Sequence, residues 1–189
     1  MTKSIRLSVF LALSILVLLT SACSSPNSSE TNSKPAASSS EISTQNESAI
    51  FGAQAAKNDK DLTLNEMLTY AIQDEYIAHA EYEYILATFG DQKPFNNIIS
   101  AEEKHIEMLR PLFDKYKTVL PADNAKDHLI IPKSIEESLK TGVQAEIDNI
   151  AMYELFLKQQ LPDDVKSVFN ELMNASKSHL NAFQKNLNK

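Results

Sequence analysis

The sequence predicts an all-α fold, a four-helix bundle built from two helical hairpins, over residues 61–188 of the 189-residue chain. The first observation is that apolar residues recur at spacings of three and four, which places them on one face of a helix. This spacing holds through four segments, 64–89, 95–116, 135–156 and 165–187. An internal repeat and a set of helix-boundary signals support the same fold.

Helix boundaries are marked on both sides of the first segment. Thr63 and Glu66 have the spacing of a capping box, in which each side chain bonds the other residue's backbone N–H. Gly90 is placed to end the helix that they start. Ser134 and Glu137 have the same spacing before the third segment. The first and third segments are therefore expected to begin as capped helices.

The four segments form two copies of one hairpin. Glu75 and Tyr82 are seven residues apart, and so are Glu146 and Tyr153. A Phe-Asn pair and a later histidine of the second segment recur in the fourth segment at an offset of 74 residues. Each hairpin has a short loop, whereas residues 118–133 between the hairpins can span the length of a bundle. This pattern is typical of a four-helix bundle with a crossover connection.

The first 22 residues have the pattern of a signal peptide. Lys3 and Arg6 precede an apolar run, 7–19, and small residues lead to Cys23, the only cysteine. The run is shorter than the ~20 residues of a membrane span, so we expect an export signal. The residues before Cys23 resemble the lipobox of bacterial lipoproteins, with Thr20 where a leucine is usual. The resemblance implies lipidation of Cys23, and the alternative is an ordinary secretory signal that leaves a free cysteine.

Residues 23–60 are rich in serine and are expected to form a disordered linker after Cys23, because such a segment buries little apolar surface. With a lipidated Cys23, the linker would hold the bundle at the extracytoplasmic side of a cell membrane. The net charge of −7 argues against nucleic-acid binding. Three isolated glycines and one cysteine exclude Gly-rich phosphate loops, internal disulfides and Cys-rich metal sites.

Each helical stripe is interrupted near its middle by side chains of the types that bind metals, namely Glu75, Glu102 with His105, Glu146, and His179. The spacing of Glu102 and His105 puts a carboxylate and an imidazole on one helix face, one turn apart. Burying ionised carboxylates costs roughly several kcal/mol each unless cations compensate them. A metal ion is therefore expected in the core. The alternative is a polar core neutralised by shifted pKa values and mutual hydrogen bonds.

Other charged side chains are assigned to the surface. His79 lies off the stripe of the first segment, and His128 lies in the crossover without a visible partner. Glu81 and Glu83 are expected to belong to a solvated, charged face.

The spacing of the metal-ligand types resembles the ferritin-like superfamily, in its rubrerythrin type. The more detailed match, over about residues 61–187, is to the DUF2202 family, and it rests on Glu75…Ala78…Tyr82, Phe95-Asn96-x-Ile98…Glu102-x-x-His105 and Ser176-x-x-His179-Leu180-x-Ala182-Phe183. The resemblance implies a ferritin-like four-helix bundle around a carboxylate-bridged di-iron centre.

The resemblance also implies roles for individual residues. Glu75 and Glu146 would be terminal ligands and Glu102 a bridging ligand, completed by His105 and His179. Tyr82 and Tyr153 would bond the carboxylates, and the alternative for both tyrosines is simple core packing.

The sequence departs from the superfamily in two positions. Ser176 stands where a second bridging glutamate is expected, and Asn149 stands where rubrerythrin-type sites often add a carboxylate. The chain also lacks the cysteines of a rubredoxin-like module. Because three carboxylates do not balance two divalent ions, we expect about one tightly held ion per chain.

The leading functional hypothesis is a membrane-anchored extracytoplasmic protein that binds one or two metal ions. Iron is expected, and manganese and zinc are alternatives, because Glu and His donors accept all three. A redox-active site would make the protein an oxidoreductase of oxidase or peroxidase type. The alternatives are a metal-binding surface protein without catalysis and a structural interaction module with a vestigial site.

Overall fold

The computed structural model describes residues 51–189, and within them it contains helices and no strand. The helices are α1 (Gly52–Asn58), α2 (Leu64–Phe89), α3 (Phe95–Tyr116), the 3-10 turn η1 (Ala125–Asp127), α4 (Ile135–Phe156) and α5 (Asp163–Leu187). The predicted all-α fold is therefore confirmed. None of these helices is long and apolar enough to cross a membrane. The predicted signal peptide and Cys23 lie outside the described residues.

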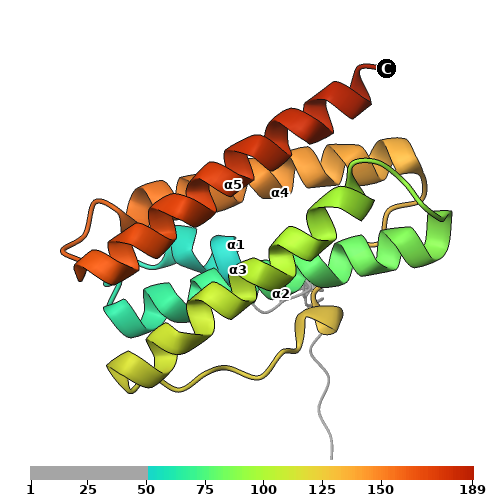
Figure 1. Cartoon of the computed structure of the whole chain (residues 1–189). Coiled ribbons are helices and arrows are strands. Elements are labelled where there is room, and N and C mark those ends of the chain that lie inside the picture. Colours follow the sequence, from blue (N-terminus) through green and yellow to red (C-terminus); the bar gives the residue numbers. More distant parts are fainter. Residues whose placement is uncertain (1–50) are drawn as a thin grey trace, which may run out of the picture. The chain divides into compact units, whose positions relative to one another are not determined.

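The four long helices form two antiparallel hairpins. α2 packs against α3, and α4 packs against α5; contacts of α2 with α4 and of α3 with α5 join the pairs. Figure 1 shows that α3 and α4 run in the same direction. The segment between them returns along the bundle and contains η1. This is the crossover connection that the sequence predicted.

The predicted boundaries of α2 and α4 are confirmed in atomic detail. The Thr63 hydroxyl accepts a hydrogen bond from the backbone N–H of Glu66, and the Glu66 carboxylate accepts one from the backbone N–H of Thr63. Gly90 follows the last residue of α2 with a φ of 80°, a conformation that glycine adopts readily. Ser134 caps α4 by accepting from the backbone N–H of Glu137.

Two apolar clusters fill the bundle core and leave its middle to polar side chains. The larger cluster includes Leu68, Leu109, Phe113, Tyr153, Phe156 and Phe169. The smaller cluster consists of Tyr82, Ile85, Phe95, Ile98, Leu139 and Phe183. Close packing at both ends holds the four helices in register, so side chains from different helices meet between the clusters.

The position of α1 shows that the last part of the predicted linker is ordered. Residues 23–60 were expected to be disordered, with the domain starting at 61, but α1 lies within this segment and packs against α2 and α4. One apolar face of this short helix is buried, and its buried members are Ala53, Ala55 and Ala56, with Phe51 just before the helix. The apolar surface that these residues bury is the physical reason why this end of the segment is ordered.

The start of α1 is held by the side chains of α2. The backbone N–H of Ala53 donates to Asp74 Oδ1 at 2.7 Å, and that of Gly52 donates to Gln73 Oε1 at 3.3 Å. Gly52 has a φ of 55°, and a Cβ atom there would lie 2.5 Å from Asp74 Oδ1. A glycine is therefore required for this close approach.

The crossover contacts the same end of α1. The rings of Phe51 and His128 are stacked, with centroids 4.2 Å apart and planes 13° from parallel. His128 is half-buried and is not the unpartnered surface side chain that the sequence predicted. α1 and the crossover thus form a layer on one side of the bundle.

Candidate metal centre

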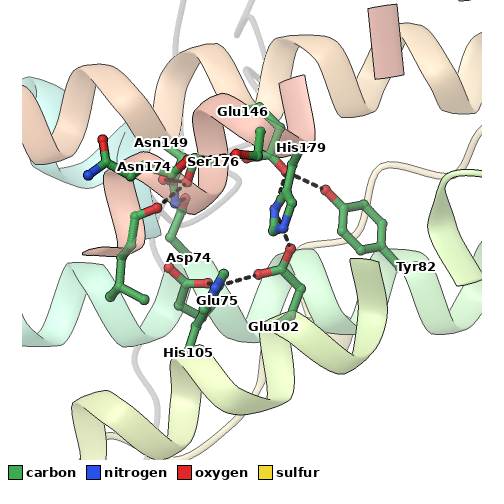
Figure 2. A network of polar contacts seen from close by, with 12 residues as sticks. Asp74, Glu75, Tyr82, Glu102, His105, Glu146, Asn149, Asn174, Ser176 and His179 are labelled. Atoms are coloured by element: carbon green, nitrogen blue, oxygen red, sulfur yellow. Dashed lines mark hydrogen bonds and ion pairs between the residues drawn. The ribbon is translucent and has the colours of Figure 1, made fainter. Parts of the chain in front are cut away.

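Five side chains of metal-ligand type meet in the middle of the bundle (Figure 2), and they come from all four long helices. They are Glu75 of α2, Glu102 and His105 of α3, Glu146 of α4, and His179 of α5. Each of these residues is buried, with at most 9% of its surface exposed. The structure therefore brings together the whole set that the sequence singled out. Their role as metal ligands stays a prediction.

The five side chains form two groups that share Glu102. In the first group, His105 Nδ1 lies 3.0 Å from Glu75 Oε2 and 2.9 Å from Glu102 Oε2. In the second, His179 Nδ1 lies 3.1 Å from Glu102 Oε1 and 3.4 Å from Glu146 Oε1. Within each group one ligand atom per residue lies within 4.8 Å of the others. Each group thus offers two carboxylates and one imidazole around a common point.

The donor set fits a cation. Glu102 Oε1 is a buried oxygen without an aligned hydrogen-bond donor, although His179 Nδ1 is 3.1 Å away. An unsatisfied carboxylate oxygen in a protein interior is costly, and a metal ion relieves this cost. Carboxylate oxygen and imidazole nitrogen are donors that iron, manganese and zinc accept.

The electrostatics of the centre are dominated by burial and by the two histidines. Burial raises the pKa of Glu75 and of Glu146 above the usual range for glutamate. Burial also opposes ionisation of Glu102, but the hydrogen bond from His105 and the positive charge of the nearby His179 outweigh it and lower the pKa of Glu102. Burial lowers the pKa of both histidines, but their close contacts with the Glu102 carboxylate outweigh burial and raise it. Without metal, protons on the histidines therefore compensate the shared carboxylate.

Two tyrosines bond the outer carboxylates. The Tyr153 hydroxyl donates to Glu75 Oε1 at 2.8 Å, and the Tyr82 hydroxyl donates to Glu146 Oε1 at 3.1 Å. Each tyrosine lies in one hairpin and the carboxylate that it bonds lies in the other. The two hydrogen bonds are therefore related by the internal repeat. The tyrosines thus hold the carboxylates in place while they also pack in the apolar clusters.

Ser176 and Asn149, the two departures from the superfamily, bond each other. The Ser176 hydroxyl donates to Asn149 Oδ1 at 2.6 Å and also lies 3.0 Å from the Leu172 carbonyl oxygen. Asn149 Nδ2 donates to Asp74 Oδ2 at 2.8 Å. Both ends of the Asn149 amide are therefore used. Figure 2 shows this chain of contacts beside the five-residue cluster.

A cavity of about 720 Å³ opens beside the centre. Its walls come mainly from α2 and α4, with α1 and the crossover contributing the outer side. Its inner end reaches the carboxylates Glu75, Glu102 and Glu146, and Ser176. The cavity thus connects the cluster with the layer that α1 forms on the bundle.

The sequence analysis placed one carboxylate of the cavity wall on the surface and overlooked another. Glu81 was expected on a solvated face, but it is only 5% exposed, and burial raises its pKa to about 7. Asp74 was not singled out at all, and burial raises its pKa to about 6. Both lie on the side of α2 that α1 and the crossover cover. His79 lies apart from the cluster, 3.4 Å from Glu103, as the sequence predicted.

A four-helix bundle with a buried, pseudo-symmetric Glu/His centre defines a class of helical metal-binding domains. Comparison with known families agrees with this class, because the rubrerythrin family model matches residues 45–187. The chain belongs to the rubrerythrin family. The match begins before residue 61, in agreement with the position of α1.

An archaeal protein resembles the chain in sequence and in structure. The chain is 28% identical over 109 residues to the uncharacterized protein MJ0754 of Methanocaldococcus jannaschii, a match that covers 50% of this chain and 59% of that protein. The crystal structure of the hypothetical protein MJ0754 from the same archaeon has a TM-score of 0.60 at 24% identity, covering 69% of this chain and 83% of that chain. This structural likeness supports the fold.

Proposed function

We propose that this protein is a membrane-anchored, extracytoplasmic metal-binding protein of DUF2202 type, with iron held by Glu75, Glu102, His105, Glu146 and His179. The observation that carries the proposal is the position of Glu102, whose two oxygens face the two histidines within a buried cluster. Bound iron would supply one-electron redox chemistry between its divalent and trivalent states, of the kind that oxidases and peroxidases use. The anchor is proposed from the sequence around Cys23.

The chain's own residues would prepare the site for this chemistry. Tyr82 and Tyr153 orient the outer carboxylates through hydrogen bonds. His105 and His179 carry protons in the metal-free site, and they must release them before their nitrogens bind a metal. The two apolar clusters exclude water from both ends of the site.

A second candidate function is metal binding without turnover. It is favoured by Ser176, because a neutral hydroxyl supplies neither the charge nor the two oxygens of a bridging carboxylate. Ser176 is moreover engaged with Asn149. A protein of this kind would store or sense a metal ion.

Metal content tests the proposal directly. The metal-free full chain is loaded with Fe(II) under anaerobic conditions, desalted and analysed by mass spectrometry of the elements. We expect about one retained iron per chain, and its loss in Glu102→Gln. Glu103→Gln is the matched control, because Glu103 is the next residue of α3 and its side chain is 65% exposed. Retention that is equal in Glu102→Gln and the unmodified chain would contradict the proposal.

Mixing the Fe(II)-loaded chain with oxygen or peroxide separates the two candidates. A redox-active centre oxidises its iron within seconds, which is followed by stopped-flow absorbance. A centre that only holds metal shows no oxidation faster than that of Fe(II) in buffer.

A further inference from the structure

The cavity beside the centre has the size and walls of a binding site for an organic molecule. Its volume of about 720 Å³ falls within the roughly 300–1,000 Å³ of known ligand sites. Apolar side chains from four parts of the fold line it, including Ala53 of α1, Ile77 and Ala78 of α2, Ile130 of the crossover and Ala145 of α4. A metal ion alone needs no such apolar walls, whereas the carbon skeleton of an organic ligand is stabilised by them.

The charged groups of the cavity are predominantly acidic. Asp74, Glu81 and Asp148 line its walls, in addition to the carboxylates of the metal centre at its inner end. The lysine that lines it, Lys140, is exposed and bonds Glu136 at 2.6 Å. An anionic ligand would therefore be repelled, and a cationic ligand would be attracted.

Among the three wall carboxylates outside the metal centre, Glu81 is the best placed to bind a cationic group. Asp74 accepts hydrogen bonds from Ala53 and Asn149, and Asp148 accepts them from two glutamine side chains. Among the described residues Glu81 accepts one hydrogen bond, from the backbone N–H of Ile130 at a long 3.4 Å. It is nevertheless buried in the cavity wall. A carboxylate with one weak partner has acceptor positions open to a further donor.

We propose that the cavity binds a small organic cation, a primary ammonium group on an apolar body, with the ammonium group bonded to Glu81. Three N–H donors of an ammonium group fit the free acceptor positions of a carboxylate. The apolar body then extends along Ala78 and Ala145 toward the metal centre. The proposal concerns the cavity itself and does not need a bound metal.

Three probes of equal length test the proposal on the metal-free full chain. Hexylammonium, 1-hexanol and hexanoate are titrated by calorimetry at pH 7.5. Hexylammonium should bind about tenfold or more tightly than hexanol, as a charge-assisted hydrogen bond predicts, and hexanoate should bind most weakly. Equal affinities, or no binding of hexylammonium at millimolar concentration, would overturn the proposal.

Single substitutions test whether Glu81 and the cavity form the binding site for hexylammonium. Glu81→Gln should lower the affinity for hexylammonium about tenfold and leave that for hexanol unchanged. Glu83→Gln is the matched control, because Glu83 is also on α2 but is exposed and pairs with Lys126. Ala78→Phe, which fills the cavity, should weaken binding of both probes.

If Glu81→Gln instead slows the uptake of Mn(II) and leaves hexylammonium affinity unchanged, the cavity is an entry route for metal ions and the proposal is wrong. Because no metal is present in the titrations, their outcome is independent of the metal-retention experiment.

Discussion

Replacement of Glu81 by glutamine should make the protein more stable at neutral and alkaline pH. The burial of Glu81 raises the pKa of its carboxyl group from the usual 4.5 to about 7, against the hydrogen bond from Ile130, and the nearby Asp74 raises it further. In the unfolded chain this carboxyl group returns to its usual pKa. Between pH 4.5 and 7 the folded protein therefore holds a proton that the unfolded chain has released, and stability falls as pH rises.

The size of the effect follows from the two pKa values. At about 1.4 kcal/mol per pKa unit, the gap between 4.5 and about 7 corresponds to about 3 kcal/mol of lost stability above pH 7. Below pH 4.5 the carboxyl group is protonated in both states and costs nothing. Glutamine carries no charge at any pH, so the variant avoids the loss.

The assay is guanidinium unfolding of the metal-free full chain, followed by circular dichroism at several values between pH 4 and pH 8.5. The free energy of unfolding of Glu81→Gln minus that of the unmodified chain should rise by about 3 kcal/mol across this range. Other titrating groups are present in both proteins and cancel in the difference. For the exposed Glu83→Gln control, the same difference should stay within about 0.5 kcal/mol. A difference for Glu81→Gln that does not change with pH would refute the reasoning.

Three further predictions concern the anchor and the centre. Cys23→Ser should move the protein from the membrane fraction to the soluble fraction after centrifugation, and a variant that still pellets would contradict lipidation. Fe(II) or Mn(II) at a thousandfold excess over its dissociation constant should stabilise the fold by about 4 kcal/mol, seen as a higher melting temperature. This rise should disappear in His105→Ala, and an equal rise in both proteins would exclude the proposed ligands. Ser176→Glu should raise the metal content from about one ion toward two, and two equally held ions in the unmodified chain would show that charge balance does not set the stoichiometry.

The five-residue cluster was predictable because helical spacing puts each of its members on the inner face of its own helix. Glu102 and His105 share a helix face at any register, and the internal repeat places Glu146 and His179 at the same level. The capping pairs predicted where α2 and α4 begin.

The cavity wall was not predictable in the same way. Glu81 and Asp74 lie beside the apolar stripe of α2, and their burial depends on α1 and the crossover. α1 has seven residues, too few turns for a clear apolar period, and it follows a serine-rich segment. The apolar run at 49–53 was the available signal for an ordered segment there.

The packing of α1 on α2 and α4 connects the bundle mechanically to the chain segment that precedes α1. A pull on the chain from its N-terminal side enters the described structure at Phe51 and reaches α2 through the bond between Ala53 and Asp74. From Asp74 the load passes through Asn149 to Ser176, beside the metal centre, within three hydrogen bonds. In a protein tethered at that end, tension would therefore act on the polar side chains next to the ligands as well as on the larger apolar cluster, to which Ala53 and Ala56 belong.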